Sequence, residues 1–278
     1  MLPATRSTTN TGLIAFGSNQ GDSMQVFEAS IDALQRIAGI EVVAYSEPIW
    51  TTPVTGTSGS ISTPSTEEQK PYLNAVIRIE TRLNPSELHL QTAAIEHQFG
   101  RVRAGRWRAR TIDLDLLLLG GHVVDTRSLT LPHPRMSFRR FVLEPAAEIA
   151  ANVVHPTSQC SMAELLKRIN SPVKTMALIA SSSKVPAAAL ENFVHLLSKK
   201  KSQWKFEKVF SAEKLSQLDS NLTIVVTFDL HASDPQDTSW QKLKKSALQF
   251  AGPTLHLKNT SNFEATLNEL VAALQTIG

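Results

Sequence analysis

The chain contains 278 residues, of which 42% are hydrophobic and 19% are charged, and its formal net charge is +3. This composition is typical of a globular protein with one large domain or two smaller ones. The small net charge excludes a strong global field that would favour nucleic acid or a membrane surface. The single cysteine, Cys160, excludes an intramolecular disulfide and fits a reducing compartment. No apolar run approaches the roughly 20 residues of a membrane span, so we expect a cytoplasmic protein.

Short strands and helices alternate along the first part of the chain, after a polar lead-in at 1–11 that we expect to be disordered. Strand patterns occupy 12–16, 40–46, 72–80 and 111–119. Helical periodicity covers 27–38 and 84–100, and Asn84, Pro85 and Glu87 form a capping signature for the second helix. The order β-α-β-β-α-β predicts a ferredoxin-like α+β sandwich for residues 12–170, completed by helices near 137–150 and 161–170.

Two connections in this region have distinctive compositions. Residues 55–70 are rich in Ser, Thr, Gly, Pro and charge, which predicts a long surface loop of the kind that often serves function. Gly120 and Gly121 predict a tight hairpin that returns through 122–124.

The composition changes after a predicted linker at 170–175. Alternating strand and helix patterns predict a smaller α/β domain with a mostly parallel sheet at 175–278. No glycine-rich phosphate loop occurs there, so we expect this domain to bind a protein partner or to self-associate rather than to catalyse. Asp229 and His231 follow a strand, where ligand sites occur in α/β sheets, but ordinary loop residues are the simpler interpretation.

The strand at 111–119 contains two carboxylates. Asp113 and Asp115 share one face with Thr111 and Leu117, while Ile112, Leu114, Leu116 and Leu118 form the core face. Same-face neighbours lie about 6.5–7 Å apart, so both carboxylates can converge on hard cations such as Mg²⁺. The pair favours such ions over zinc, because no Cys/His cluster accompanies it.

An arginine-rich segment precedes this strand, with arginines at 101, 103, 106, 108 and 110 and a tryptophan at 107. One guanidinium group can donate two hydrogen bonds to the oxygens of a phosphate. The segment and the aspartates together therefore indicate metal-dependent phosphoryl chemistry. Each feature alone has an ordinary interpretation, namely a half-exposed strand and a solvated or RNA-binding basic loop.

Five motifs occur in order: "GSNQGD", "PYLNAVIRIET", "IEHQFGRVR", "RWRARTIDLDLLLLG" and "LTLPHPRM". Together they resemble the 6-hydroxymethyl-7,8-dihydropterin pyrophosphokinase family over residues 12–170. The resemblance implies transfer of the diphosphoryl group of ATP to the hydroxymethyl oxygen of 6-hydroxymethyl-7,8-dihydropterin, with release of AMP, in folate biosynthesis.

The resemblance also implies roles for individual residues. Two Mg²⁺ ions are expected on Asp113 and Asp115, and these two residues are expected to act in catalysis with Arg101 and Arg110. The positions that match ATP-binding residues are Glu96, Arg101, Arg103, Trp107, Arg110, Thr130, His133 and Arg139. The positions that match pterin-binding residues are Thr51, Pro53, Val54, Tyr72, Asn74 and Phe141. Stacking aromatics and an amide with donor and acceptor suit a flat heterocycle.

Two other functions stay open. An RNA-binding module would use the arginine-rich segment for phosphates and would not need Asp113. A pseudoenzyme or scaffold is the second, because Arg108 and Ala109 stand where the family typically has Gly-Pro. The presence of Asn74, Asp113 and Asp115 favours the enzyme over both.

Overall fold

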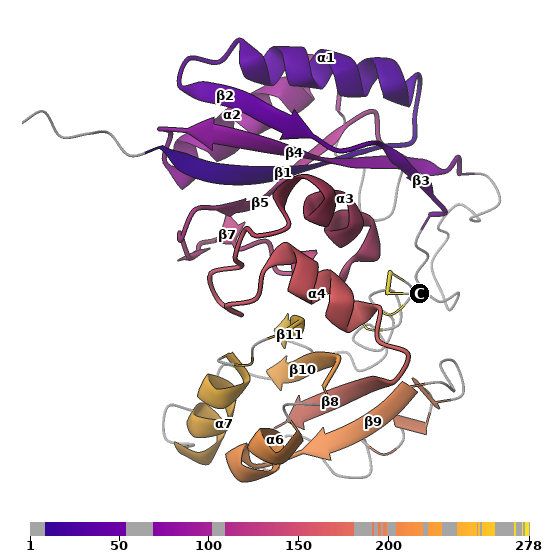
Figure 1. Ribbon diagram of the computed structural model, residues 1–278, viewed down its shortest axis with the longest axis vertical. Helices are drawn as coiled ribbons and strands as arrows, with labels where there is room; N and C mark the ends of the chain where they lie inside the picture. Colours follow the sequence, from indigo (N-terminus) through magenta and orange to yellow (C-terminus); the bar gives the residue numbers. More distant parts are fainter. Residues whose placement is uncertain are drawn as a thin grey trace, which may run out of the picture. The chain divides into compact units, whose positions relative to one another are not determined.

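The computed structural model describes residues 9–53, 69–101 and 109–180, and, beyond these, 191, 194–195, 197–198, 204–218, 222–229, 238–248, 250, 252–258, 270, 274 and 276–277. It divides into two compact units (Figure 1). The first contains the described residues up to 133 together with 144–156, and the second contains 134–143 and the described residues from 157 onward. None of the described helices has an apolar stretch long enough to span a bilayer.

The first unit is a mixed α/β structure built on an antiparallel sheet. Its strands are β1 (Asn10–Ser18), β2 (Ile40–Tyr45), β3 (Ile49–Thr51), β4 (Tyr72–Thr81) and β5 (Asp113–Leu119), in the order β2-β4-β1-β5 with β3 paired to β4. Its helices α1 (Ser23–Gln35) and α2 (Pro85–Gln98) follow β1 and β4. The four predicted strands and both predicted helices are therefore present, and β3 is an addition.

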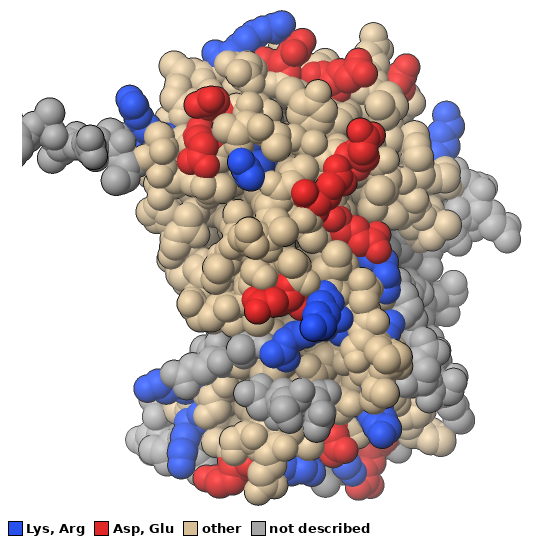
Figure 2. Space-filling view, viewed as in Figure 1, with Lys and Arg blue, Asp and Glu red and all other residues tan. Residues whose placement is uncertain are grey.

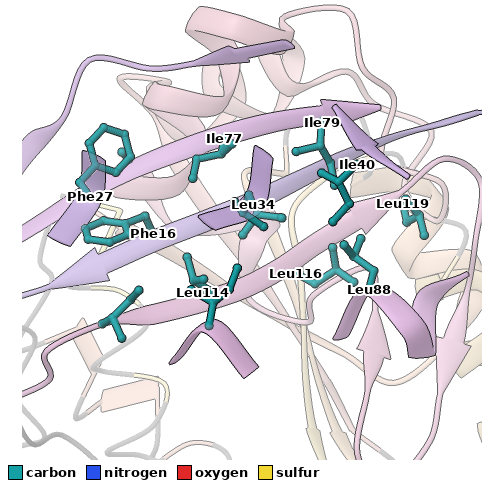
Figure 3. Close-up of a cluster of buried hydrophobic side chains, with 14 of the residues drawn as sticks. Phe16, Phe27, Leu34, Ile40, Ile77, Ile79, Leu88, Leu114, Leu116 and Leu119 are labelled. Carbon is teal, nitrogen blue, oxygen red and sulfur yellow. The ribbon is translucent and has the colours of Figure 1, made fainter. Parts of the chain in front are cut away.

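One face of this sheet carries the hydrophobic core (Figure 3). Alternate residues of β1 and β4, including Phe16 and Ile77, pack with Phe27 and Leu34 of α1 and with Leu88 of α2. Full burial of each such side chain contributes about 1.5–3 kcal/mol. Helices α1 and α2 therefore cover the same face and leave the opposite face of β1, β4 and β5 for other contacts.

The start of α2 has the predicted capping signature. The Asn84 side chain accepts hydrogen bonds from the Ser86 and Glu87 amides, both at 3.0 Å, and Glu87 accepts from the Asn84 amide at 2.8 Å. This reciprocal capping fixes the start of the helix that carries Glu96.

Strand β5 departs from the predicted alternation. Leu118 pairs with Leu13 and Leu116 with Ile14, so Leu117 is an extra residue in a β-bulge. Past the bulge the faces exchange, and Leu119 rather than Leu118 joins the core cluster. The prediction that Leu118 lies on the core face is wrong for this reason.

The predicted hairpin after β5 is also wrong. A turn does form, since the His122 amide donates to Leu119 O at 3.0 Å, but β6 (Val124–Asp125) pairs with β7 (Thr130–Leu131) instead of β5. The outer edge of β5 has other partners: Glu96 binds the Leu114 amide, and the His133 amide donates to Leu117 O. A returning strand would have to displace both.

The second unit begins with η2 (Met136–Phe138) and the first residues of α3 (Arg140–Ala150), and continues with α4 (Met162–Ile169). Its sheet has the order β11-β10-β8-β9 and is parallel throughout, as predicted. The strands are β8 (Lys174–Ala180), β9 (Trp204–Val209), β10 (Ile224–Asp229) and β11 (Thr254–Lys258), and the helices are α6 (Ala212–Leu218) and α7 (Thr238–Leu248). Asp229 ends β10, and His231 lies outside the described residues. Helix α4, expected in the first domain, packs with this unit.

Candidate active site

The face of the sheet opposite the core carries a polar strip across three strands. Gly17 of β1 lies opposite Asn74 of β4 on one side and opposite Asp113 of β5 on the other. A Cβ atom placed on Gly17 would lie 3.8 Å from Asn74 Oδ1 and 3.8 Å from Asp113 Cβ. The glycine therefore places no side chain between an amide and a carboxylate, and the next row places Ala15 opposite Asp115.

The β4 end of the strip is polar. The Asn74 amide nitrogen donates to Thr51 Oγ1 at 2.8 Å and to Tyr72 O at 3.3 Å, while Asn74 itself is buried. Burial raises the pKa of the Tyr72 hydroxyl, Arg110 lowers it and Asp113 raises it further. Three predicted pterin residues, Thr51, Tyr72 and Asn74, therefore lie together.

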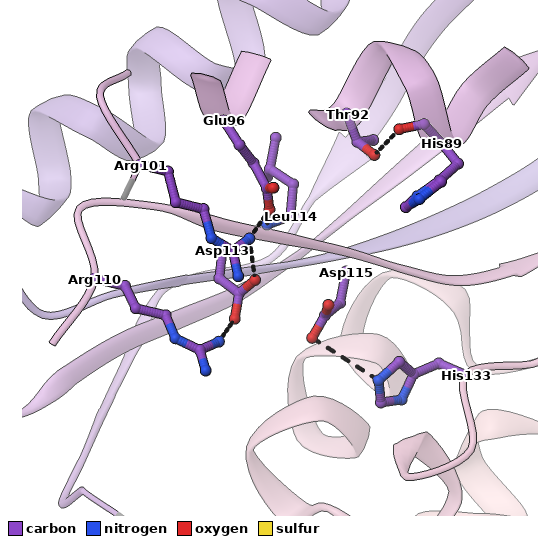
Figure 4. Close-up of polar contacts among 9 residues, drawn as sticks. All are labelled: His89, Thr92, Glu96, Arg101, Arg110, Asp113, Leu114, Asp115 and His133. Atoms are coloured by element: carbon purple, nitrogen blue, oxygen red, sulfur yellow. Dashed lines mark hydrogen bonds and ion pairs between the residues drawn. The ribbon is translucent and has the colours of Figure 1, made fainter. Parts of the chain in front are cut away.

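Two arginines surround Asp113 (Figure 4). Arg110 Nη1 bonds to Asp113 Oδ2, and Arg101 Nη1 lies 2.6 Å from Asp113 Oδ1. Burial raises the pKa of Asp113 and the nearby charge of Asp115 raises it further, while both arginines lower it; the net direction is upward. Burial alone would lower the pKa of Arg110, but Asp113 raises it above its usual value. Guanidinium groups thus offset the buried charge directly.

Glu96 of α2 holds the edge of β5. Its carboxylate is buried, accepts the Leu114 amide at 2.8 Å and pairs with Arg101. Burial raises its pKa, although the Leu114 hydrogen bond and Arg101 both lower it. Leu114 lies between Asp113 and Asp115 in β5. The hydrogen bond from its amide to Glu96 therefore holds the backbone of the strand between the two aspartates.

Asp115 and His133 form the other end of the site. His133 Nε2 lies 3.9 Å from Asp115 Oδ2, and the His133 amide donates to the carbonyl of the bulge residue Leu117 at 2.7 Å. The bulge therefore helps to position His133, whose side chain faces Asp115 in Figure 4. Thr130, predicted with it, begins the short strand β7.

Asn19 is a site-forming residue to which the sequence assigned no role. The Asn19 amide donates to Arg110 O at 3.1 Å, and the Arg110 amide donates to Asn19 Oδ1 at 2.8 Å. The side-chain nitrogen of Asn19, Nδ2, donates to Lys70 O at 3.2 Å and to Gln69 Oε1 at 3.4 Å. Asn19 thereby joins the approach to β4 with the approach to β5, and the motif "GSNQGD" was the available signal.

Six other residues are predicted to bind substrate. Val54, Arg103 and Trp107 lie outside the described residues, and Pro53 lies half-buried just past β3. Arg139 and Phe141 belong to the second unit, where the Arg139 guanidinium lies 5.5 Å from the centre of the Phe141 ring. In the part of the chain that the structure describes, no group of three or more His, Cys, Asp or Glu side chains could hold a metal ion.

Comparisons with known proteins identify the first half of the chain. The family model of 7,8-dihydro-6-hydroxymethylpterin-pyrophosphokinase (HPPK) matches residues 13–151. The 2-amino-4-hydroxy-6-hydroxymethyldihydropteridine pyrophosphokinase of Haemophilus influenzae is 36% identical over 158 residues, which cover 57% of this chain and 92% of that protein. The Bacillus subtilis protein of the same name is 40% identical over 144 residues, covering 52% of this chain and 80% of that protein.

The solved structure of Plasmodium falciparum HPPK-DHPS with pteroate has a TM-score of 0.45 at 9% identity and covers 89% of this chain and 64% of that one. A likeness this low adds nothing on fold or function. The family match over half of the chain and the extensive coverage of the bacterial relatives are sufficient: the chain belongs to the 7,8-dihydro-6-hydroxymethylpterin-pyrophosphokinase family.

Proposed function

We propose that this chain transfers the diphosphoryl group of ATP to the hydroxymethyl oxygen of 6-hydroxymethyl-7,8-dihydropterin in folate biosynthesis. Family membership makes it a pyrophosphokinase with ATP as co-substrate. The observation that carries the assignment of the site is the strip in which Gly17 separates the Asn74 amide from the Asp113 carboxylate. It offers a group proposed to bind the pterin and a group proposed to act at the phosphates on the same face of the sheet.

The chemistry requires the pterin oxygen to attack the β-phosphorus of ATP as the bond from that phosphorus to the α-phosphate oxygen breaks. AMP leaves, and the hydroxyl proton passes to water. Such transfers depend mainly on positioning and on neutralisation of charge. We assign the pterin edge to Asn74 and Thr51, with Tyr72, Phe141, Pro53 and Val54 around the ring.

The phosphate side is built from guanidinium groups. Arg101 and Arg110 are assigned to the triphosphate, because each has donors in addition to those that contact Asp113. His133 and Thr130 are assigned to ATP with Arg103, Trp107 and Arg139. We assign Glu96 a part in ATP binding through Arg101, which it contacts.

We also propose that Asp113 and Asp115 hold two Mg²⁺ ions. Two carboxylates on one strand face supply hard oxygen ligands but too few to complete a shell, which suits Mg²⁺ that takes its other ligands from phosphate and water. When bound, the ions would neutralise phosphate charge. Asp113 would contribute an oxygen while its arginine partners keep it oriented.

The antiparallel order β2-β4-β1-β5 with both helices on one face supports the ferredoxin-like class for the first domain. We propose residues 12–170 as the pyrophosphokinase domain and 175–278 as an accessory α/β domain with a binding or self-association role. The single cysteine supports a cytoplasmic location.

An RNA-binding function predicts a continuous basic surface. On the face drawn in Figure 2, Lys and Arg side chains stand singly or in small groups among acidic ones. The small net charge of +3 favours the enzyme.

The deciding experiment measures AMP formation from ATP and 6-hydroxymethyl-7,8-dihydropterin by the full chain, with Mg²⁺ and with a chelator. We expect pterin-dependent and Mg²⁺-dependent AMP, lost in Asp113→Asn and Asp115→Asn. The matched control is Asp32→Asn, because Asp32 is an exposed carboxylate of α1. No AMP from the unaltered chain, together with salt-dependent RNA binding, would refute the proposal.

A further inference from the structure

The segment 136–141 is embedded in the second unit. Met136, Ser137 and Phe138 are almost completely buried, and so are Val142 and Leu143 immediately after it. Between these two buried stretches, Arg139, Arg140 and Phe141 are half-buried. The segment is therefore anchored on both sides while three consecutive side chains keep access to solvent.

Residues from the C-terminal part of the chain bind this segment through polar contacts. Ser137 Oγ donates to Thr254 O at 3.3 Å and accepts from the Thr254 amide at 3.2 Å, at the first residue of β11. The Arg140 amide donates to Thr276 O at 2.9 Å. Arg140 Nε and Nη2 both donate to Ile277 O, at 3.2 and 2.9 Å.

Arg140 is tied by its backbone and by its side chain at once, which restricts both the orientation of its peptide plane and its rotamer. Its two neighbours are Arg139 and Phe141, whose side chains stack at 5.5 Å. Arg139 O also accepts the Val142 and Leu143 amides, at 3.1 and 2.9 Å. The directions in which residues 139 and 141 leave the backbone therefore depend on the contacts of Arg140.

We infer that the C-terminal part of the chain, through Thr254, Thr276 and Ile277, positions Arg139 and Phe141 for substrate binding, and that Arg140 is the positioning residue. This rests on the proposed function, which assigns Arg139 to ATP and Phe141 to the pterin. Residues 175–278 then act on substrate affinity and are more than a detachable accessory.

The test compares full-length variants. Arg140→Ala removes the side-chain tie and should raise the KM of both ATP and the pterin about tenfold, since small misplacements of binding groups have large kinetic effects. Arg140→Lys retains a donor and should restore part of the loss. Ser137→Ala removes the other tie and should act in the same direction, which keeps the test informative if Arg140→Ala folds poorly.

The matched control is Arg168→Ala. Arg168 also donates to a backbone carbonyl of the second unit, Leu222 O at 3.4 Å, and lies 5.4 Å from the centre of the Phe250 ring, and both of these partners lie outside 136–141. We expect it to lower Tm and leave both KM values unchanged. Hydrogen exchange of the 140–143 amides should accelerate in Arg140→Ala and not in Arg168→Ala.

The outcomes separate the inference from the function. If Arg140→Ala leaves both KM values unchanged, or if Arg168→Ala raises them equally, the inference is overturned while the pyrophosphokinase stands. If the unaltered chain makes no AMP, the proposed function fails. Hydrogen exchange of the 140–143 amides then still tests whether Arg140 holds this segment in place. Unchanged exchange rates in Arg140→Ala would show that it does not.

Discussion

A methyl group added at Gly17 tests the proposed substrate surface with little disturbance of the fold. In Gly17→Ala the new Cβ atom would meet Asn74 Oδ1 and Asp113 Cβ at 3.8 Å, which is ordinary van der Waals contact. The backbone of Gly17 lies outside the left-handed region, so alanine adopts it without strain. We therefore expect unfolding free energy to stay within about 1 kcal/mol of the parent value, with a gain favoured by the stiffer unfolded chain.

Activity should respond in the opposite way. The methyl group stands on the surface between the group proposed to read the pterin and the group proposed to act at the phosphates. A displacement of the pterin oxygen by about 1 Å corresponds to about a 100-fold loss of rate. We expect kcat/KM for the pterin to fall by about that factor.

Gly12 of the same strand provides the matched control. A Cβ atom there would lie 2.9 Å from Ile79 Cγ1 and 3.3 Å from Leu119 Cδ1, in the core. Overpacking of this kind costs about 1–3 kcal/mol. Gly12→Ala should therefore lose stability in urea unfolding and keep its kcat/KM. If Gly17→Ala retains full activity, or if both variants lose activity in proportion to stability, the proposed surface is wrong.

Three further predictions concern Asn19, Asn84 and His155. Asn19→Asp keeps the acceptor for the Arg110 amide but loses the donor to Lys70 O, on the approach to β4, which carries the proposed pterin residues. In initial-rate assays the KM for the pterin should therefore rise severalfold while the KM for ATP stays unchanged. Asn19→Ala loses both contacts and should raise both KM values. Asn84→Ala removes the α2 cap and should cost about 0.5–2 kcal/mol in urea unfolding, with unchanged kinetics. Burial lowers the pKa of His155 to about 4 from 6.5, so its neutral form stabilises the fold above pH 6.5 and this contribution disappears as pH falls toward 4. The full effect is about 3 kcal/mol; His155→Gln should flatten the decline in Tm between those pH values, and an unchanged slope would contradict the assignment.

Local sequence signals predicted the elements that depend on local physics. The Asn84–Glu87 pair specified the start of α2 because both halves of a capping box lie within four residues. The strand patterns at 12–16 and 72–80 likewise predicted β1 and β4. The face of Asp113 and Asp115 likewise followed from the period of a strand.

Features that depend on distant partners were not predictable in this way. The bulge at Leu117 exists because β5 must satisfy β1 on one edge and His133 on the other, and no local pattern encodes both. Strand β6 pairs with β7 and not with β5, because Glu96 and His133 already occupy the outer edge of β5. In β9, "WKFEKV" mixes charged with apolar residues. The sequence pattern therefore did not predict that this segment forms the edge strand of the parallel sheet.

The sequence predicted a hard cation at Asp113, and in the structure Arg101 and Arg110 contact its carboxylate directly. This arrangement has a consequence for nucleotide binding. Phosphate groups drawn to those arginines would compete with Asp113 and would leave it beside the like charge of Asp115, which already raises its pKa. We propose that Asp113 and Asp115 would hold a divalent cation whose charge would replace the charge that the arginines withdraw, which would remove that conflict. Nucleotide and Mg²⁺ should therefore bind with positive coupling, which would originate in the shared arginines.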